Sequence, residues 1–154
     1  DVRGVAVPVQ PTSGRPAFSI VGLADKAVAE NRERVRGALH AMGLALPSKR
    51  ITVNLAPADL LKEGSHFDLP IALGLLAAMG VLPVDEIGGY TALGELALDG
   101  GLTNVVGVLP AAIHASAQGN GLICPGGQGS EAAWAGEVEI LAPDTLLALV
   151  NHFK

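Results

Sequence analysis

The sequence has few of the residues that several classes of binding site require. It contains a single cysteine, Cys124, and only five aromatic side chains among 154 residues. One cysteine excludes a disulfide framework and any zinc site built from cysteines. So few aromatic rings exclude a base-stacking surface of the kind that binds single-stranded nucleic acid.

Ligand patterns for metals and phosphates are missing too. The P-loop pattern GxxxxGK[ST] does not occur, and the glycine-rich stretches 119–121 and 126–129 do not follow the GxGxxG spacing between a strand and a helix. We interpret both stretches as turns. No HxxxH or HxxE spacing that would suit a metal connects the four histidines, His40, His66, His114 and His152. We therefore expect no metal and no cofactor in this chain.

Long hydrophobic runs are also missing, although 49% of the residues are apolar and only 16% are charged. The longest run, from Leu69 to Leu82, is shorter than the roughly 20 residues that a bilayer span needs, so it predicts a buried helix. The chain does not open with a charged segment followed by an apolar one. We expect one cytoplasmic domain over residues 1–154 with no membrane partner. Because the chain starts without methionine, we expect it to be a fragment of a longer protein.

The net charge of −5 conceals an uneven distribution. Residues 1–62 carry nine basic and five acidic residues, whereas residues 63–154 carry one basic and ten acidic residues. Two interpretations stay open: complementary faces that meet in an oligomer, or a basic face that meets a polyanion. The candidates for contact with the phosphates of such a polyanion are Arg32, Arg34, Arg36, Lys49 and Arg50. For the three arginines of the predicted helix, a solvated helix face is the alternative, because each has acidic residues nearby.

Hydrophobic periodicity predicts an α/β domain with a mixed sheet. We expect a hairpin of two strands over residues 4–22, with Val5, Val7 and Val9 alternating along the first strand. Further strands are predicted over residues 51–56, 90–98, 102–106, 121–124 and 138–141. Helices are predicted over residues 25–42, 68–79, 109–117, 129–135 and 144–153.

Several local features refine these elements. An apolar stripe along the first helix includes Asn31, and Glu30 precedes Arg34 by four residues, which favours a helical ion pair. Asp99-Gly100-Gly101 has the chemistry of a hairpin turn. Pro110 falls in the first turn of its helix, where a missing N–H costs little. Asp144 is expected to cap the last helix.

The stretch Ser65-His66-Phe67-Asp68 brings together residue types found in catalytic triads. Neighbours in sequence point away from one another, whereas a triad needs side chains that converge from separate elements. Ser65 and Asp68 instead have the spacing of a capping box at the start of the apolar helix. Elsewhere, we expect Cys124 to be an inert thiol in the core and Trp134 to be an anchor in the core or at its edge.

Three long stretches resemble one protein family. They are residues 14–36 (GRPAFSIVGLADKAVAENRERVR), residues 49–72 with their blocks KRITVNLAPAD and KEGSHFDLPIA, and residues 94–100 (GELALDG). Together they span most of residues 14–117 and are similar to the N-terminal domain of the ComM/YifB family. These bacterial AAA+ proteins are related to the magnesium-chelatase ATPase subunit. The stretch 126–132 departs from the family, which usually has an asparagine-alanine pair there.

The resemblance implies a fold and a setting. The fold would be that of the proteolytic domain of Lon, the ribosomal protein S5 domain 2-like fold. An AAA+ motor that binds ATP and magnesium would follow in the full-length protein. The family is similar to hexameric helicases and is implicated in DNA branch migration during natural transformation. The expected partners are the other subunits of a homo-hexameric ring and DNA.

The family resemblance also lets the protease function be checked on individual residues. Lon-type catalysis uses a serine at the start of a helix and a lysine after a Gly-Gly-Leu stretch. The corresponding positions here hold Asp68 and Pro110. A serine–lysine dyad needs a hydroxyl nucleophile and a neutral amine, so neither position could serve. The alternative pair, Ser65 with Lys62, would require the loop to shift by about three residues.

The sequence therefore predicts a non-catalytic, Lon-like scaffold domain of a ComM-type ATPase or helicase. On this hypothesis the domain has no enzymatic activity of its own, and the motor hydrolyses ATP outside this chain. The rival hypothesis is an ATP-dependent protease domain that uses Ser65 with Lys62. A third possibility, an accessory subunit of a metal chelatase, has no metal-ligand pattern to support it.

Overall fold

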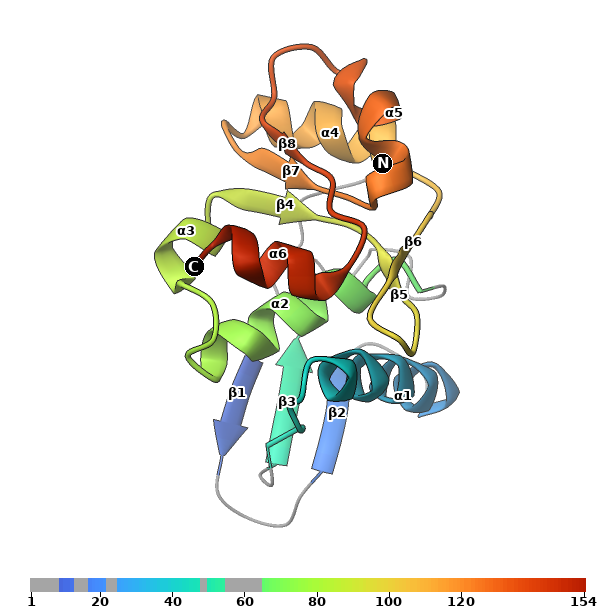
Figure 1. The fold of residues 1–154 in the computed structure, drawn as a ribbon, viewed down its shortest axis with the longest axis vertical. Coiled ribbons are helices and arrows are strands. Elements are labelled where there is room, and N and C mark those ends of the chain that lie inside the picture. The colour runs from blue at the N-terminus through green and yellow to red at the C-terminus, as the bar shows by residue number, and fades with distance from the viewer. Residues whose placement is uncertain (1–8, 13–16, 22–24, 48–49, 55–64) are drawn as a thin grey trace.

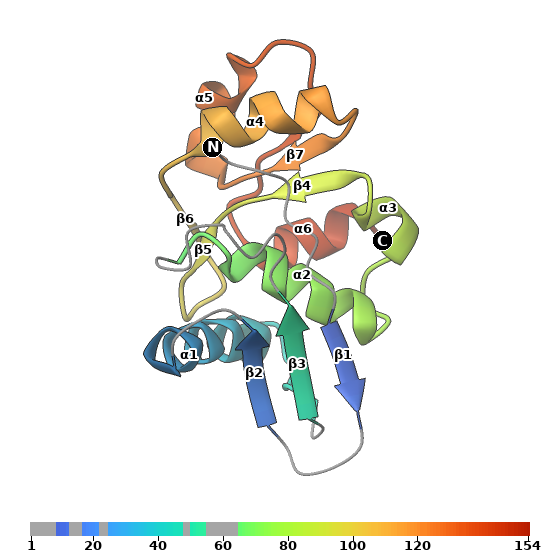
Figure 2. The same ribbon diagram turned by 180° about the vertical axis from the view of Figure 1, so that it is seen from behind.

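The fold comes from a computed structural model, which describes residues 9–12, 17–21, 25–47, 50–54 and 65–154. It is a mixed α/β arrangement with two three-stranded sheets and one two-stranded hairpin within those ranges. Figures 1 and 2 show helix α2 between the two three-stranded sheets, and helix α1 beside the first sheet. The predicted α/β class is confirmed.

The first sheet contains β1 (Val9–Thr12), β2 (Ala17–Val21) and β3 (Arg50–Asn54) in the order β1-β3-β2. Strand β3 is antiparallel to β1 and parallel to β2. The predicted hairpin is therefore wrong, because β3 lies between the two strands that were expected to pair. Of the alternating valines, Val5 and Val7 lie outside the described residues.

Helix α1 (Asp25–Ala41) follows the predicted range within one residue. Its apolar stripe is buried as expected: Asn31, Val35, Ala38 and Leu39 are each at most 3% exposed. Helix α2 (Asp68–Ala78) also matches its prediction, and eight of its side chains are buried. The two helices contact each other, so each contributes part of one core.

The second sheet is parallel throughout and contains β4 (Tyr90–Ala92), β7 (Gly121–Ile123) and β8 (Ile140–Leu141). One of its faces is covered by α4 (Val108–Ala117) and α5 (Gly129–Ala133), the latter preceded by a 3-10 turn at Gly126–Gln128. Helix α2 and α6 (Leu146–His152) cover the other face. The apolar residues accordingly form two separate clusters, one on each side of this sheet.

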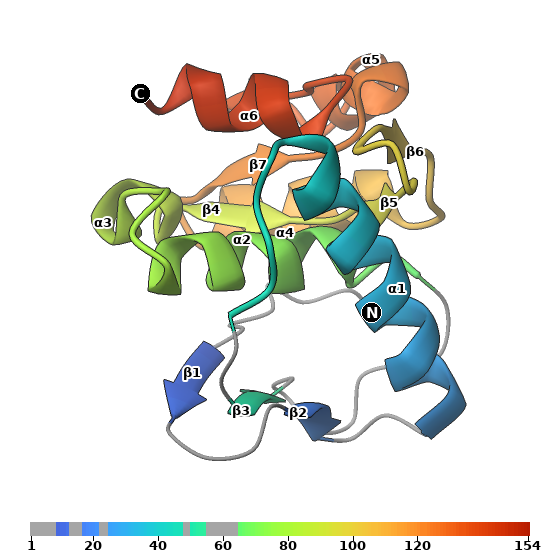
Figure 3. The ribbon, with the colours of Figure 1, turned by 60° about the horizontal axis from the view of Figure 1, so that its bottom comes forward.

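A small hairpin lies between the second sheet and α1. Strands β5 (Glu95–Leu96) and β6 (Leu102–Thr103) pair across the predicted turn at residues 99–101. A short helix, α3 (Val84–Ile87), precedes β4. The hairpin tip packs closely on α1. A side chain added at Gly37 would lie only 2.9 Å from the side chain of Leu98. Figure 3 shows the hairpin beside α1, and Gly100 at the tip lies near Ala38 and Ala41 in the second half of that helix.

Two local predictions at the C-terminal end are wrong. Helix α6 is capped by Thr145, whose hydroxyl accepts the N–H of Ala148 at 3.0 Å, and not by Asp144. Trp134 is 84% exposed and anchors neither cluster. In both cases the side chain that the sequence pattern favoured lies at the surface. Within the described ranges, no helix is long and apolar enough to cross a membrane.

Candidate functional site

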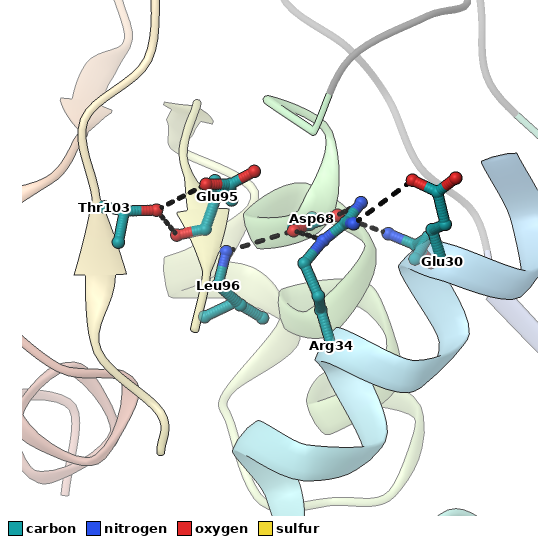
Figure 4. Close-up of polar contacts among 7 residues, drawn as sticks. Glu30, Arg34, Asp68, Glu95, Leu96 and Thr103 are labelled. Carbon is teal, nitrogen blue, oxygen red and sulfur yellow. Dashed lines mark hydrogen bonds and ion pairs between the residues drawn. The ribbon is translucent and has the colours of Figure 1, made fainter. Parts of the chain in front are cut away.

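The position that resembles the Lon nucleophile is occupied by Asp68, the first residue of α2. Its side chain is 1% exposed, although ionisable side chains are rarely buried unless they are paired. Burial raises the pKa of Asp68, against the opposing effects of its hydrogen-bond donors. This residue lies at the centre of a polar network that joins α1, α2 and the β5–β6 hairpin, as Figure 4 shows.

Helix α1 supplies two donors to Asp68. Arg34 donates through Nε to Oδ2 at 2.6 Å and through Nη2 to Oδ1 at 3.1 Å. Asn31, one turn earlier on the same face, donates through Nδ2 to Oδ1 at 2.7 Å. The two-point contact of a guanidinium with a carboxylate fixes direction as well as distance. It therefore sets how α1 lies against the start of α2.

The hairpin supplies the third donor. The backbone N–H of Leu96 on β5 donates to Oδ2 of Asp68 at 3.0 Å. The neighbouring Glu95 is hydrogen-bonded by Ser65 and by Thr103 of β6, and these contacts lower the pKa of Glu95. The carboxylate of Glu95 thus lies beside this network, on the hairpin strand that binds Asp68. The network occupies both oxygens of Asp68.

The predicted capping box is wrong. The residue before α2 is Phe67, which makes no side-chain capping bond, and the Ser65 carbonyl oxygen accepts the backbone N–H of Asp68 at 3.0 Å. The carboxylate of Asp68 does not reach back to its own helix N-terminus, because α1 and β5 provide donors on the other side. Tertiary partners have displaced the local motif.

The two positions that the resemblance assigns to a Lon-type dyad lie in different surroundings. Pro110 is an exposed residue in the first turn of α4, as predicted, and its helix packs in the cluster on the far side of the second sheet from α2. Proline has no side-chain base. Lys62, the amine of the alternative pair, lies outside the described residues.

The candidates for DNA contact separate into two groups. Arg32 and Arg36 are exposed on α1, and Arg36 forms an ion pair with Glu33 at 2.7 Å. Arg34 is different, because its side chain is 22% exposed and its guanidinium is directed at Asp68. The predicted Glu30–Arg34 pair is present at 3.9 Å but is the looser contact. Lys49 and the side chain of Arg50 lie outside the described part of the chain.

Sequence reasoning missed the role of Gln128. This buried side chain accepts the backbone N–H of Val105 at 2.9 Å and donates to the carbonyl oxygen of the same residue at 2.7 Å. It thereby attaches the 3-10 turn before α5 to the segment before α4. The sequence offered one signal, because Gln128 lies in the stretch that departs from the family pattern. The spacing of residues in that stretch does not show that the side chain binds the backbone of Val105.

The expectation for Cys124 is confirmed. The thiol is buried, and burial raises its pKa to about 11, so the reactive thiolate is disfavoured. Among the residues that the structure describes, no three histidine, cysteine or acidic side chains are grouped in a way that could hold a metal ion.

Comparisons with known proteins agree with the resemblance found in the sequence. The family described as subunit ChlI of Mg-chelatase matches residues 7–128. Competence protein ComM of Haemophilus influenzae is 43% identical over 150 residues, which cover 97% of this chain and 30% of that protein. The uncharacterized protein YifB of Escherichia coli is 44% identical over 119 residues, which cover 77% of this chain and 24% of that protein. The chain thus spans less than a third of the length of these relatives, and it belongs to the ComM/YifB family of magnesium-chelatase-like proteins.

Proposed function

We propose that this chain is a non-catalytic scaffold domain of a ComM-type AAA+ protein. It would help to assemble a homo-hexameric ring and to position DNA during branch migration, while ATP and magnesium are bound by another part of the protein. The observation that carries this proposal is the Arg34–Asp68 contact. Asp68 is buried and occupies the position at which the resemblance places the nucleophile of Lon.

The chemistry of that contact is unsuited to attack on a peptide bond. A nucleophile must reach its substrate, yet Asp68 is 1% exposed and both of its oxygens accept hydrogen bonds. Its closest basic partner is a guanidinium, which does not deprotonate in proteins and so cannot act as a base. A pair of this kind holds elements together, which is what a scaffold requires.

The finer fold assignment belongs to the same proposal. The mixed α/β architecture is compatible with the ribosomal protein S5 domain 2-like fold of the Lon proteolytic domain. On this view the domain kept the Lon-like fold and lost the dyad. The setting would be the cytoplasm, where recombining DNA is found.

The rival protease hypothesis gives the first test. Full-length protein carrying this chain is incubated with casein and ATP, beside its Ser65→Ala variant. The scaffold proposal expects ATP hydrolysis without casein cleavage in both proteins. Casein cleavage that requires ATP and disappears in Ser65→Ala would overturn it.

The DNA role is tested by the salt dependence of binding. Charge reversals at Lys49 with Arg50, and separately at Arg32 with Arg36, are compared in the full-length protein. Each lost phosphate contact should lower the magnitude of the slope of log K against log salt by about 1. Arg34 is left unchanged because it holds Asp68. An affinity and slope that neither pair changes would remove these side chains from DNA contact.

A further inference from the structure

Trp134 is the chain's single tryptophan, and it lies on the surface. It follows the last residue of α5 and is 84% exposed, the most exposed aromatic among the large apolar side chains of the described residues. Exposing so large an apolar side chain to water is unfavourable, and tryptophan is one of the residue types enriched among the side chains that dominate binding at the centres of protein interfaces. The exposure therefore points to a partner that covers it.

The surroundings of Trp134 define the charge of that partner. Glu131, one turn earlier on α5, and Glu137, three residues later, are both exposed. Residues 63–153 contain no lysine or arginine at all. An interface on this surface is favoured when the partner brings positive charge, because like charges repel and the indole ring attracts a cation over its face.

The chain carries a matching surface of its own. Arg32 and Arg36 are exposed one turn apart on α1, so they project from one side of that helix. Arg36 pairs with Glu33, but both partners are more than half exposed and such pairs are readily exchanged. Figure 1 shows α5 near one end of the molecule's longest axis and α1 toward the other. These two surfaces cannot meet within one molecule.

We propose that the Trp134–Glu131 surface of α5 binds the Arg32–Arg36 surface of α1 of a second copy of this chain. One guanidinium would lie over the indole ring while the other pairs with the carboxylate of Glu131. The contact joins different surfaces of the two copies, so it is heterologous and can close into a ring. The inference rests on the proposed function in that it assigns one subunit contact of the proposed ring.

The single tryptophan makes the contact directly measurable. Emission spectra of the 154-residue chain are recorded over a dilution series, with the molar mass measured by light scattering after gel filtration. As the chain associates, the emission of Trp134 should move to shorter wavelength and its quenching by acrylamide should fall. Dissociation on dilution or in high salt should reverse both changes.

Charge-reversal variants test the two surfaces separately. Glu131→Arg and the double variant Arg32→Glu with Arg36→Glu should each weaken self-association about tenfold or more. Lys26→Glu reverses an exposed charge on another side of α1 and should leave association unchanged. An equimolar mixture of Glu131→Arg with the double variant should associate more strongly than either variant alone, because each variant retains one intact surface and the two reversed surfaces carry opposite charges.

The outcomes that overturn the inference are separate from those that overturn the scaffold proposal. Wild-type chain that stays monomeric with unshifted Trp134 emission rejects the contact, as does a variant mixture that associates no more strongly than either variant alone. The contact is also rejected if the double variant associates as strongly as the wild-type chain while its salt slope for DNA binding falls. In that case the exposed arginines of α1 would face DNA. Casein cleavage that depends on Ser65 bears on the scaffold proposal alone.

Discussion

Arg34 on α1 donates hydrogen bonds to both carboxylate oxygens of Asp68 on α2, although 34 positions separate the two residues. The contact closes a long segment of chain and fixes the angle at which α1 meets the buried helix. Arg34 retains some exposure while Asp68 has almost none. The two partners therefore differ in what they lose when the other is removed.

That asymmetry predicts an ordered double-mutant cycle. Asp68→Asn should lower the free energy of unfolding by about 3 kcal/mol, because the unpaired Arg34 can still turn toward water. Arg34→Met should cost more, about 4–5 kcal/mol, because it leaves a buried carboxylate without its cation. The double variant should cost clearly less than the sum of the two. Urea denaturation followed by circular dichroism measures all three.

The control for this cycle is Arg36→Met, which removes an exposed pair two residues away on the same helix. It should leave the urea midpoint unchanged. Additive costs in the double variant would show that Arg34 and Asp68 do not interact energetically, whatever their distance.

The same pair shows what could be predicted from the sequence. The helical period placed Asn31 and Val35 on the buried face of α1 and suggested the local Glu30–Arg34 contact, which is present. It could not show that Arg34 has a closer partner on α2, because spacing along one helix holds no information about another element. The capping-box prediction for Asp68 is wrong for the same reason.

Strand pairing in the first sheet failed on a similar point. Alternation and a proline-glycine turn favoured pairing between neighbours in sequence, yet β3 lies between β1 and β2. The parallel β2–β3 pair requires a crossover, which α1 provides, and no local signal marks it. The hairpin at residues 99–101 was predicted because its register depends on the turn itself.

His66 predicts how stability varies with pH. Burial lowers the pKa of His66, so the unfolded chain takes up a proton near pH 6.5 while the folded chain resists until lower pH. Below pH 6.5 the unfolded state therefore binds more protons, and the free energy of unfolding falls as the pH falls. For one proton the slope cannot exceed about 1.4 kcal/mol per pH unit.

Urea denaturation between about pH 5 and pH 8 measures this slope, because that range extends to both sides of the pKa of a histidine in an unfolded chain. His66→Gln should flatten the part of the slope that lies just below pH 6.5. His40→Gln changes an exposed histidine of α1 and should leave the slope as it is. A slope that His66→Gln does not alter would contradict the prediction.

Gln128 predicts a stability effect at a turn. Gln128→Ala leaves the N–H and the carbonyl oxygen of Val105 without their partner, and it should cost about 1–3 kcal/mol. Gln118→Ala, at an exposed position after α4, is the matched control and should have no effect. Equal urea midpoints for the two variants would show that water replaces the Gln128 contacts.

The start of α6 separates two adjacent side chains that both suit a helix cap. Thr145 accepts the N–H of Ala148, whereas Asp144 is exposed and makes no capping bond. Thr145→Ala should therefore lower the free energy of unfolding by about 1 kcal/mol, while Thr145→Ser, which keeps the hydroxyl, should cost little. Asp144→Ala should leave the melting temperature unchanged. A larger loss in Asp144→Ala than in Thr145→Ala, measured by calorimetry, would return the cap to the residue that the sequence pattern favoured.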